Sequence, residues 1–167
     1  MDGTYKLLLV LHLTCVVVGI GGVMLNGVYG LQAKARPGPG GLAITEANHT
    51  ASTIAEYFVY GIPVFGILMV LKFDAWKFSQ TWVWLSILLY VTALGIVHGI
   101  MVPNVKKMIE LQKELVSMGP PSGAPTGGPP PQVGELERRG KTLATFGPML
   151  NIIAVAIIIL MVTKPGF

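Results

Sequence analysis

Residues 7–22 read LLLVLHLTCVVVGIGG, an apolar run that is interrupted by a single imidazole, His12. A helix that crosses the hydrocarbon core of a bilayer needs about 20 mostly apolar residues. This run supplies them together with its flanks, so it predicts a membrane-spanning helix. An ionisable ring inside such a helix costs free energy unless it faces other helices. The run therefore also raises the question of what His12 contacts.

Three further stretches have the length and apolar character of spans. Of the 167 residues, 52% are hydrophobic and only 12% are charged, whereas soluble domains carry about 25% charged residues. We expect one integral membrane domain over residues 1–167, an all-α bundle of four transmembrane helices at residues 5–31, 54–71, 81–102 and 143–163. We expect the third helix to stop before Pro103, because proline removes a hydrogen-bond donor and clashes inside a helix.

The segments between the spans differ in character. ARPGPGG at residues 35–41 ends the first helix, and residues 103–118 place apolar side chains at helical spacing. These residues predict an amphipathic helix at the membrane surface or against a partner. Residues 119–134 are rich in Pro and Gly and predict an extended linker.

The distribution of cations predicts an orientation. Four spans place both termini on one side, and the two longer connections hold eight of the twelve Lys and Arg residues: Lys34, Arg36, Lys106, Lys107, Lys113, Arg138, Arg139 and Lys141. The positive-inside rule then makes these connections cytoplasmic. We expect a multi-pass protein of the cell inner membrane with both termini outside the cytoplasm, and no cleaved signal peptide, because no small-residue cleavage site closes the first apolar run. The net charge of +4 is interpreted as this orientation signal and not as a nucleic-acid footprint.

A small polar set falls in the inner half of the predicted membrane. Glu56, His98 and Asn26 have similar depth, and His49 lies just below them at the boundary. A carboxylate and an imidazole can share a proton and lower each other's cost of burial, so a Glu56–His98 pair is chemically natural, although the sequence does not determine whether the two side chains meet. If His49 reached them, two histidines and a carboxylate could hold a haem or a metal. The alternatives are a purely structural polar clasp for Glu56 and His98, and a solvated His49.

His12 has a different predicted depth from His98. With a rise of about 1.5 Å per residue, the two rings should lie on the order of 20 Å apart along the membrane normal. That separation disfavours one haem iron between them. The simpler interpretation of His12 is a hydrogen bond to a neighbouring helix, and that of Cys15, the only cysteine, is a small buried hydrophobe.

Small residues mark two helix faces. Gly19, Gly22 and Gly30 follow one face of the first helix, and Gly95 and Gly99 form a GxxxG pair around His98. Small residues let helix backbones approach closely in lipid. We expect these faces to be packing seams, with His98 turned toward a close helix contact.

Two stretches, LLLVLHLTCVVVGIGGV and WLSILLYVTALGIVHGIMVPNVKKMIEL, resemble a family of small predicted integral membrane proteins of bacteria, of unknown function. More distantly, LHLTCVVVGIGG is similar to the first helix of the copper-resistance D domain and of the four-helix haem-b protoporphyrinogen oxidases. That resemblance implies a haem or copper role with His12 as the candidate ligand. The chain departs from these relatives in lacking a methionine-rich or histidine-rich copper-collecting segment.

The sequence carries no soluble-enzyme motif, and whether the chain is an enzyme stays open, with the balance against it. The leading hypothesis is an integral membrane protein that works as a homo-oligomer or as an accessory subunit of a larger membrane complex. One alternative is a haem-b membrane protein in electron or proton transfer, with His12 or His98 as axial ligand, and another is a small proton-coupled transporter that uses Glu56 and His98. No nucleic-acid partner is expected, and no metal site is assigned.

Overall fold

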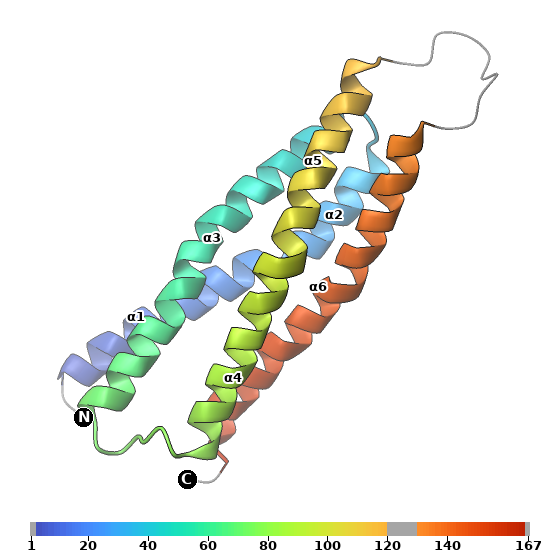
Figure 1. Cartoon of the computed structure of the whole chain (residues 1–167). Helices are drawn as coiled ribbons and strands as arrows, with labels where there is room; N and C mark the ends of the chain where they lie inside the picture. The colour runs from blue at the N-terminus through green and yellow to red at the C-terminus, as the bar shows by residue number, and fades with distance from the viewer. Residues whose placement is uncertain (1–2, 120–129, 166–167) are drawn as a thin grey trace.

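The computed structural model describes residues 3–119 and 130–165, and it contains only helices in those ranges (Figure 1). In chain order they are α1 (Gly3–Met24), α2 (Asn26–Ala35), α3 (Pro39–Lys72), α4 (Thr81–Ile96), the π-helical turn η1 (Val97–Met101), α5 (Val102–Ser117) and α6 (Pro131–Thr163).

These elements join into four continuous rods, and each is long and apolar enough to cross a membrane. The rods cover Gly3–Ala35, Pro39–Lys72, Thr81–Ser117 and Pro131–Thr163, with lengths of 33 to 37 residues. At about 1.5 Å per residue each rod is roughly 50 Å long, which exceeds the hydrocarbon core by about 20 Å. The prediction of an all-α, four-helix membrane protein is therefore confirmed, but every helix is longer than its apolar span.

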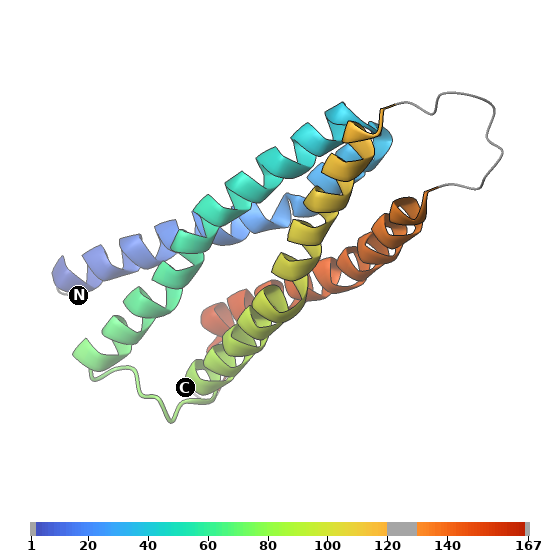
Figure 2. The ribbon, with the colours of Figure 1, turned by 45° about the horizontal axis from the view of Figure 1, so that its top comes forward.

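The rods pack as two antiparallel pairs. In one pair the rod α1–α2 lies along α3, and in the other the rod α4–η1–α5 lies along α6. Figure 2 shows the two pairs close together at the end formed by α2 and α5 and separating toward the end that carries both termini. As expected, both termini lie at the same end of the bundle.

The second helix begins much earlier than expected. The apolar span 54–71 is only the second half of α3, which starts at Pro39. The mostly polar residues 45–53 are also helical, because a helix does not need apolar side chains where it extends beyond the lipid. Before it, Gly38 has φ 81° and makes the turn out of α2, as the Pro/Gly-rich stretch predicts.

The expected stop at Pro103 is wrong. The helix continues through Pro103 to Ser117, and the π turn Val97–Met101 stands immediately before it. A π turn widens the helix by one residue, which leaves room for a ring that would otherwise meet the carbonyl four residues back. The side chain of Asn104 donates to the Ile100 carbonyl at 2.8 Å and so pairs one of the carbonyls at this irregularity.

The predicted amphipathic helix is present as α5, and it packs inside the molecule against α6 and α3. The linker expected at residues 119–134 is shorter at its far end, because α6 already begins at Pro131. Residues 120–129 of that linker lie outside the described residues.

The most extensive helix contact is the seam between α1 and α3. A Cβ added to Gly19 would lie 2.9 Å from the Val59 nitrogen, and one added to Gly22 would lie 2.9 Å from the Ala55 Cβ. The expected packing role of these two glycines is confirmed. Gly30, Gly95 and Gly99, in contrast, have nothing within 4 Å of an added Cβ among the described residues, so the expected seam around Gly95 and Gly99 is absent from the single chain.

Candidate functional site

The central polar group of the molecule joins α3 to the π turn η1. Glu56 and Tyr60 lie one turn apart on α3, and His98 lies on η1. The Tyr60 hydroxyl donates to Glu56 Oε1, and it lies 2.8 Å from His98 Nε2. His98 Nε2 and Glu56 Oε1 are themselves 3.3 Å apart. Glu56 and His98, whose pairing the sequence left open, are therefore in contact, with a phenol added beside them.

Tyr60 is the residue that sequence reasoning missed. Its ring is nearly parallel to the His98 imidazole, with centroids 6.2 Å apart and an interplanar angle of 12°. The available signal was its spacing, because a residue four positions after Glu56 projects from the same face of a helix. As a neutral phenol, Tyr60 lacks the charge that distinguishes Glu56 in an apolar helix. We call Glu56, Tyr60 and His98 the polar triad.

Asn26 and His49 do not join the polar triad. Asn26 Oδ1 accepts a hydrogen bond from the Ser52 hydroxyl at 2.8 Å, one turn of α3 before Glu56. His49 precedes Glu56 by seven residues, which places it about 10 Å away along the helix. Within residues 3–119 and 130–165, no three His, Cys, Asp or Glu side chains come together in a way that could hold a metal ion. The expected inclusion of Asn26 is wrong, and His49 does not complete a ligand set.

His12 lies in the seam between α1 and α3. Its side chain is 8% exposed, and its Nδ1 is 2.9 Å from the Ile62 carbonyl oxygen. The ring packs on Gly66, whose added Cβ would lie 3.2 Å from His12 Cε1. The expected hydrogen bond to a neighbouring helix is confirmed. Cys15 is buried in the same seam and packs on Gly61.

The two membrane histidines sit on different faces of α3. His12 meets α3 at Ile62 and Gly66, whereas His98 meets it at Glu56 and Tyr60. The midpoints of these contacts are six residues apart, which corresponds to roughly 9 Å along the axis and roughly 120° around it. The depth difference is smaller than the 20 Å expected, because the helices are offset along the membrane normal. Since α3 stands between the two rings, they do not fit a single bis-histidine haem.

The polar triad is accessible on the surface of the single chain. Tyr60 is 41% exposed, and the side chains of His98 and Glu56 are 46% and 28% exposed. Beside it, Gly95 and Gly99 are also open, and so is Val91, which is 58% exposed. Polar atoms and small residues therefore share one uncovered face at membrane depth.

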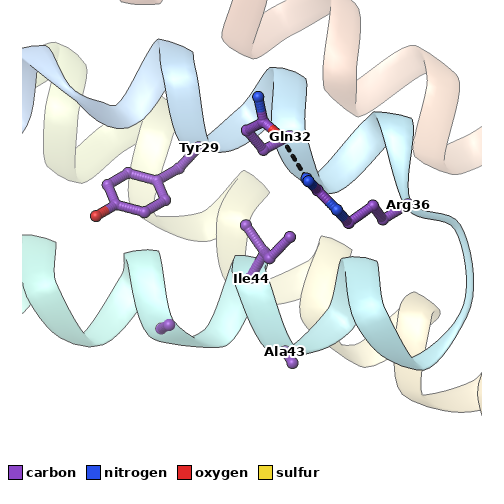
Figure 3. A pocket seen from close by; sticks show the side chains of 6 residues that line it. Tyr29, Gln32, Arg36, Ala43 and Ile44 are labelled. Atoms are coloured by element: carbon purple, nitrogen blue, oxygen red, sulfur yellow. Dashed lines mark hydrogen bonds between the residues drawn. The ribbon is translucent and has the colours of Figure 1, made fainter.

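Figure 3 shows a surface hollow between α2 and α3, and no member of the polar triad lines it. Its lining is mostly apolar with one cation, and it consists of Tyr29, Gln32, Arg36, Ala43, Ile44 and Ala47. Arg36 donates to the Gln32 side chain, as the dashed line marks. A second hollow lies on α1 and is lined by residues 10, 13, 14, 17 and 18. Neither hollow contains a site residue expected from the sequence.

Aromatic side chains gather at the end that carries the termini. Trp76 and Trp82 make an edge-to-face contact with centroids 5.4 Å apart, and Lys164 Nζ lies 3.9 Å from the Trp76 ring centroid. The lysine thereby ties the end of α6 to the turn between α3 and α4 through a cation–π contact. This position agrees with the aromatic belt expected at a membrane interface.

Comparison with known protein families, curated proteins and solved structures finds no match for this chain. The function must therefore be argued from the geometry of the site.

Proposed function

We propose that this chain is a non-enzymatic integral membrane protein that works as a subunit of a larger membrane assembly, in the first instance a homo-oligomer. The observation that carries the proposal is the exposure of the polar triad. Ionisable side chains at membrane depth are costly in contact with lipid and almost always face protein or a hydrated cavity. A second protein surface over Glu56, Tyr60 and His98 removes that cost.

The residues beside the polar triad favour a second copy of the same chain as this surface. Gly95 and Gly99 form an open GxxxG pair in an apolar helix, with no heavy atom of the described residues near their added Cβ positions. Such pairs let two identical helices approach closely about a two-fold axis, because each copy presents the same small residues to the other. No large side chain of the described residues is fully buried within one chain, which fits a molecule that completes its packing in an assembly.

The test is the oligomeric state, measured by light scattering in a mild detergent and by energy transfer between labelled copies in liposomes. We expect an oligomer for the natural sequence and at least about tenfold weaker association for Gly95→Leu combined with Gly99→Leu. Gly21→Leu is the matched control, because Gly21 is also exposed and has nothing within 4 Å, but has no glycine one turn away.

A monodisperse monomer in both detergent and bilayer, without a partner in a native pull-down, would overturn the subunit role. A stable complex with a different membrane protein, lost on the same glycine substitutions, would keep the subunit role and overturn the second copy as the partner.

The haem alternative rests on the resemblance of the first helix. His12 and His98 do not fit a shared iron, because they contact different faces of α3. Binding of haem by one of the two histidines alone can be tested by an oxidised-minus-reduced visible spectrum. The spectrum is taken from protein purified from cells well supplied with haem. We expect no Soret or α bands. Near-stoichiometric bands that disappear in His12→Ala or His98→Ala would replace our proposal with a haem protein.

We also propose the inner membrane as the location, with both termini outside the cytoplasm. The asymmetric distribution of Lys and Arg supports this orientation, because eight of twelve lie on the two longer connections.

A further inference from the structure

One face of α3 carries a polar side chain at every turn from its first third to the polar triad. The spacing of three, four, three and four residues keeps these side chains on one side of the helix. They are Glu46, His49, Thr53, Glu56 and Tyr60. The next two positions of the same spacing, 63 and 67, are proline and isoleucine. We call the end of the bundle formed by α2 and α5 the loop end. The polar stripe therefore reaches from this loop end to His98 and stops there.

The stripe lies against the rod formed by α4, η1 and α5. At its loop end, Glu46 Oε1 is 2.9 Å from Lys113 Nζ on α5. At its other end, Glu56 and Tyr60 meet His98 on η1. Neighbouring side chains three or four residues apart on a helix lie about 5–6 Å from one another. A single water molecule can bridge polar groups at such a spacing.

We propose that Glu56, Tyr60 and His98 form a proton-exchange site that equilibrates with the aqueous phase at the loop end through this stripe. The site holds one mobile proton between a carboxylate and an imidazole. This proton-exchange role goes beyond the role as a subunit, and it does not depend on whether the chain forms an oligomer.

The transfer needs no other reactant. Protonated Glu56 gives its proton to the Tyr60 oxygen while the Tyr60 hydroxyl proton passes to His98 Nε2, so that the phenol is neutral before and after. The reverse transfer restores the first state. The contacts needed for both directions are already in place, since Tyr60 contacts Glu56 Oε1 and His98 Nε2 at once. Between the two states the hydroxyl proton of Tyr60 turns from Glu56 Oε1, to which it donates in this structure, toward His98 Nε2.

Other titratable groups near the site are few. On α4, the Tyr90 hydroxyl is directed to the Val59 carbonyl. On α1, His12 and Cys15 pack on another face of α3. On α5, Lys113 pairs with Glu46 and Lys107 with Glu110. Among the described residues, the ion pairs join no lysine or arginine to Glu56. His98 is thus the charge partner of Glu56.

The chain suits a direct test, because it has three histidines, His12, His49 and His98. Protein with ¹⁵N-labelled histidine, at one copy per lipid nanodisc, allows each imidazole to be followed by NMR as pH is changed. Single His→Gln substitutions assign the resonances.

The first readout is coupling. We expect Glu56→Gln to shift the midpoint of the His98 titration by at least about one pH unit, which is tenfold in proton affinity. Glu46→Gln is the control, because Glu46 lies on the same stripe but pairs with Lys113; it should leave the midpoint unchanged. An unchanged midpoint in Glu56→Gln would overturn the shared site.

The second readout is the rate at which the His98 imidazole proton exchanges with water. We expect Tyr60→Phe and Thr53→Val to slow it at least about tenfold, and Thr53→Ser to retain it because the hydroxyl remains. Thr92→Val is the matched control, since Thr92, like Thr53, is exposed and donates to the carbonyl four residues back. Equal rates in all variants would overturn access along the stripe, and circular dichroism of each variant shows that a slowed rate is not a folding defect.

Discussion

At the scale of single residues, the seam between α1 and α3 depends on the absence of side chains. Gly19 lies where a Cβ would be 2.9 Å from a backbone nitrogen of α3, and backbone cannot move aside as a flexible side chain can. Two positions later, Gly21 faces open space. Glycine on α1 is therefore required for close packing at position 19, whereas at position 21 there is space for a side chain.

We predict that Gly19→Ala destabilises the protein by about 1–3 kcal/mol, because the added methyl overpacks the seam. Gly21→Ala should be neutral or slightly stabilising, because alanine favours the helix by about 1 kcal/mol over glycine. Unfolding in mixed micelles with increasing sodium dodecyl sulfate measures both. Equal stabilities for the two variants would contradict the close approach at Gly19.

Two members of the polar triad could be identified as candidates from their residue types alone, and the third could not. Glu56 is the only acidic residue inside the four expected spans, so a search for its partner could begin from the sequence, and His98 was its one imidazole at similar depth. Tyr60 carries no charge at neutral pH and gave no such starting point. Its role became visible only when α3 and η1 were placed side by side.

At the scale of elements, irregular helix positions are compensated by side chains from a neighbour. Pro63 cannot donate a hydrogen bond to the carbonyl of Val59, four residues before it in α3. The Tyr90 hydroxyl on α4 donates to that carbonyl at 3.1 Å. The proline and the tyrosine are therefore parts of one arrangement that joins the two helix pairs.

This arrangement predicts coupling between Tyr90 and Pro63. Tyr90→Phe should cost about 1–3 kcal/mol of stability, because it leaves a part-buried carbonyl without a donor. In a Pro63→Ala background the backbone can supply that donor, so the same change should cost clearly less. A double-mutant cycle of the free energy of unfolding measures the difference, and additive effects would show that the tyrosine does not serve the carbonyl freed by the proline.

Asn104, which follows the π turn, differs in that its side chain serves a carbonyl of its own continuous helix. Its side chain donates to the Ile100 carbonyl and accepts from Arg139 Nη1 on α6 at 2.9 Å. We predict that Asn104→Ala lowers the free energy of unfolding by about 1–2 kcal/mol. Lys107→Ala is the contrast, because its ion pair with Glu110 is exposed and such pairs contribute about 0–1 kcal/mol. Thermal unfolding of both variants checks the order, and an equal or larger loss for Lys107→Ala would contradict it.

At the scale of the whole molecule, the two helix pairs meet mainly near the loop end, and the polar triad links them while it remains exposed at the surface. Direct links between α3 and the rod of α4, η1 and α5 include the Tyr90–Val59 hydrogen bond, the polar triad and the Lys113–Glu46 ion pair. Polar groups thus contribute directly to the connection between the pairs.

The charge distribution predicts the orientation of the whole molecule. In a Cys15→Ser background, a cysteine at Ser79 in the turn between α3 and α4 should react with a membrane-impermeant maleimide from outside intact cells. A cysteine at Ser117, at the end of α5, should react only when the inner face is opened. Both original serines are exposed, so accessibility is not limited by the fold. The reverse labelling pattern would place the termini in the cytoplasm.

The sequence by itself determined the all-α class, the four spans and the shared side of the termini, because apolar length is a local property of a chain in lipid. It also identified Glu56 and His98 as ionisable groups at similar depth, but their contact was decided by the tertiary structure. Only the tertiary structure decided that Tyr60 bridges that pair, that Asn26 and His49 stand apart from it, that the helix passes through Pro103, and that Gly19 is closed while Gly95 and Gly99 are open. The physical reason is that these features depend on how helices are rotated and offset against one another. The spacing of residues in the sequence indicates which of them share a face of a helix. Which of these faces is packed depends on the position of the neighbouring helix.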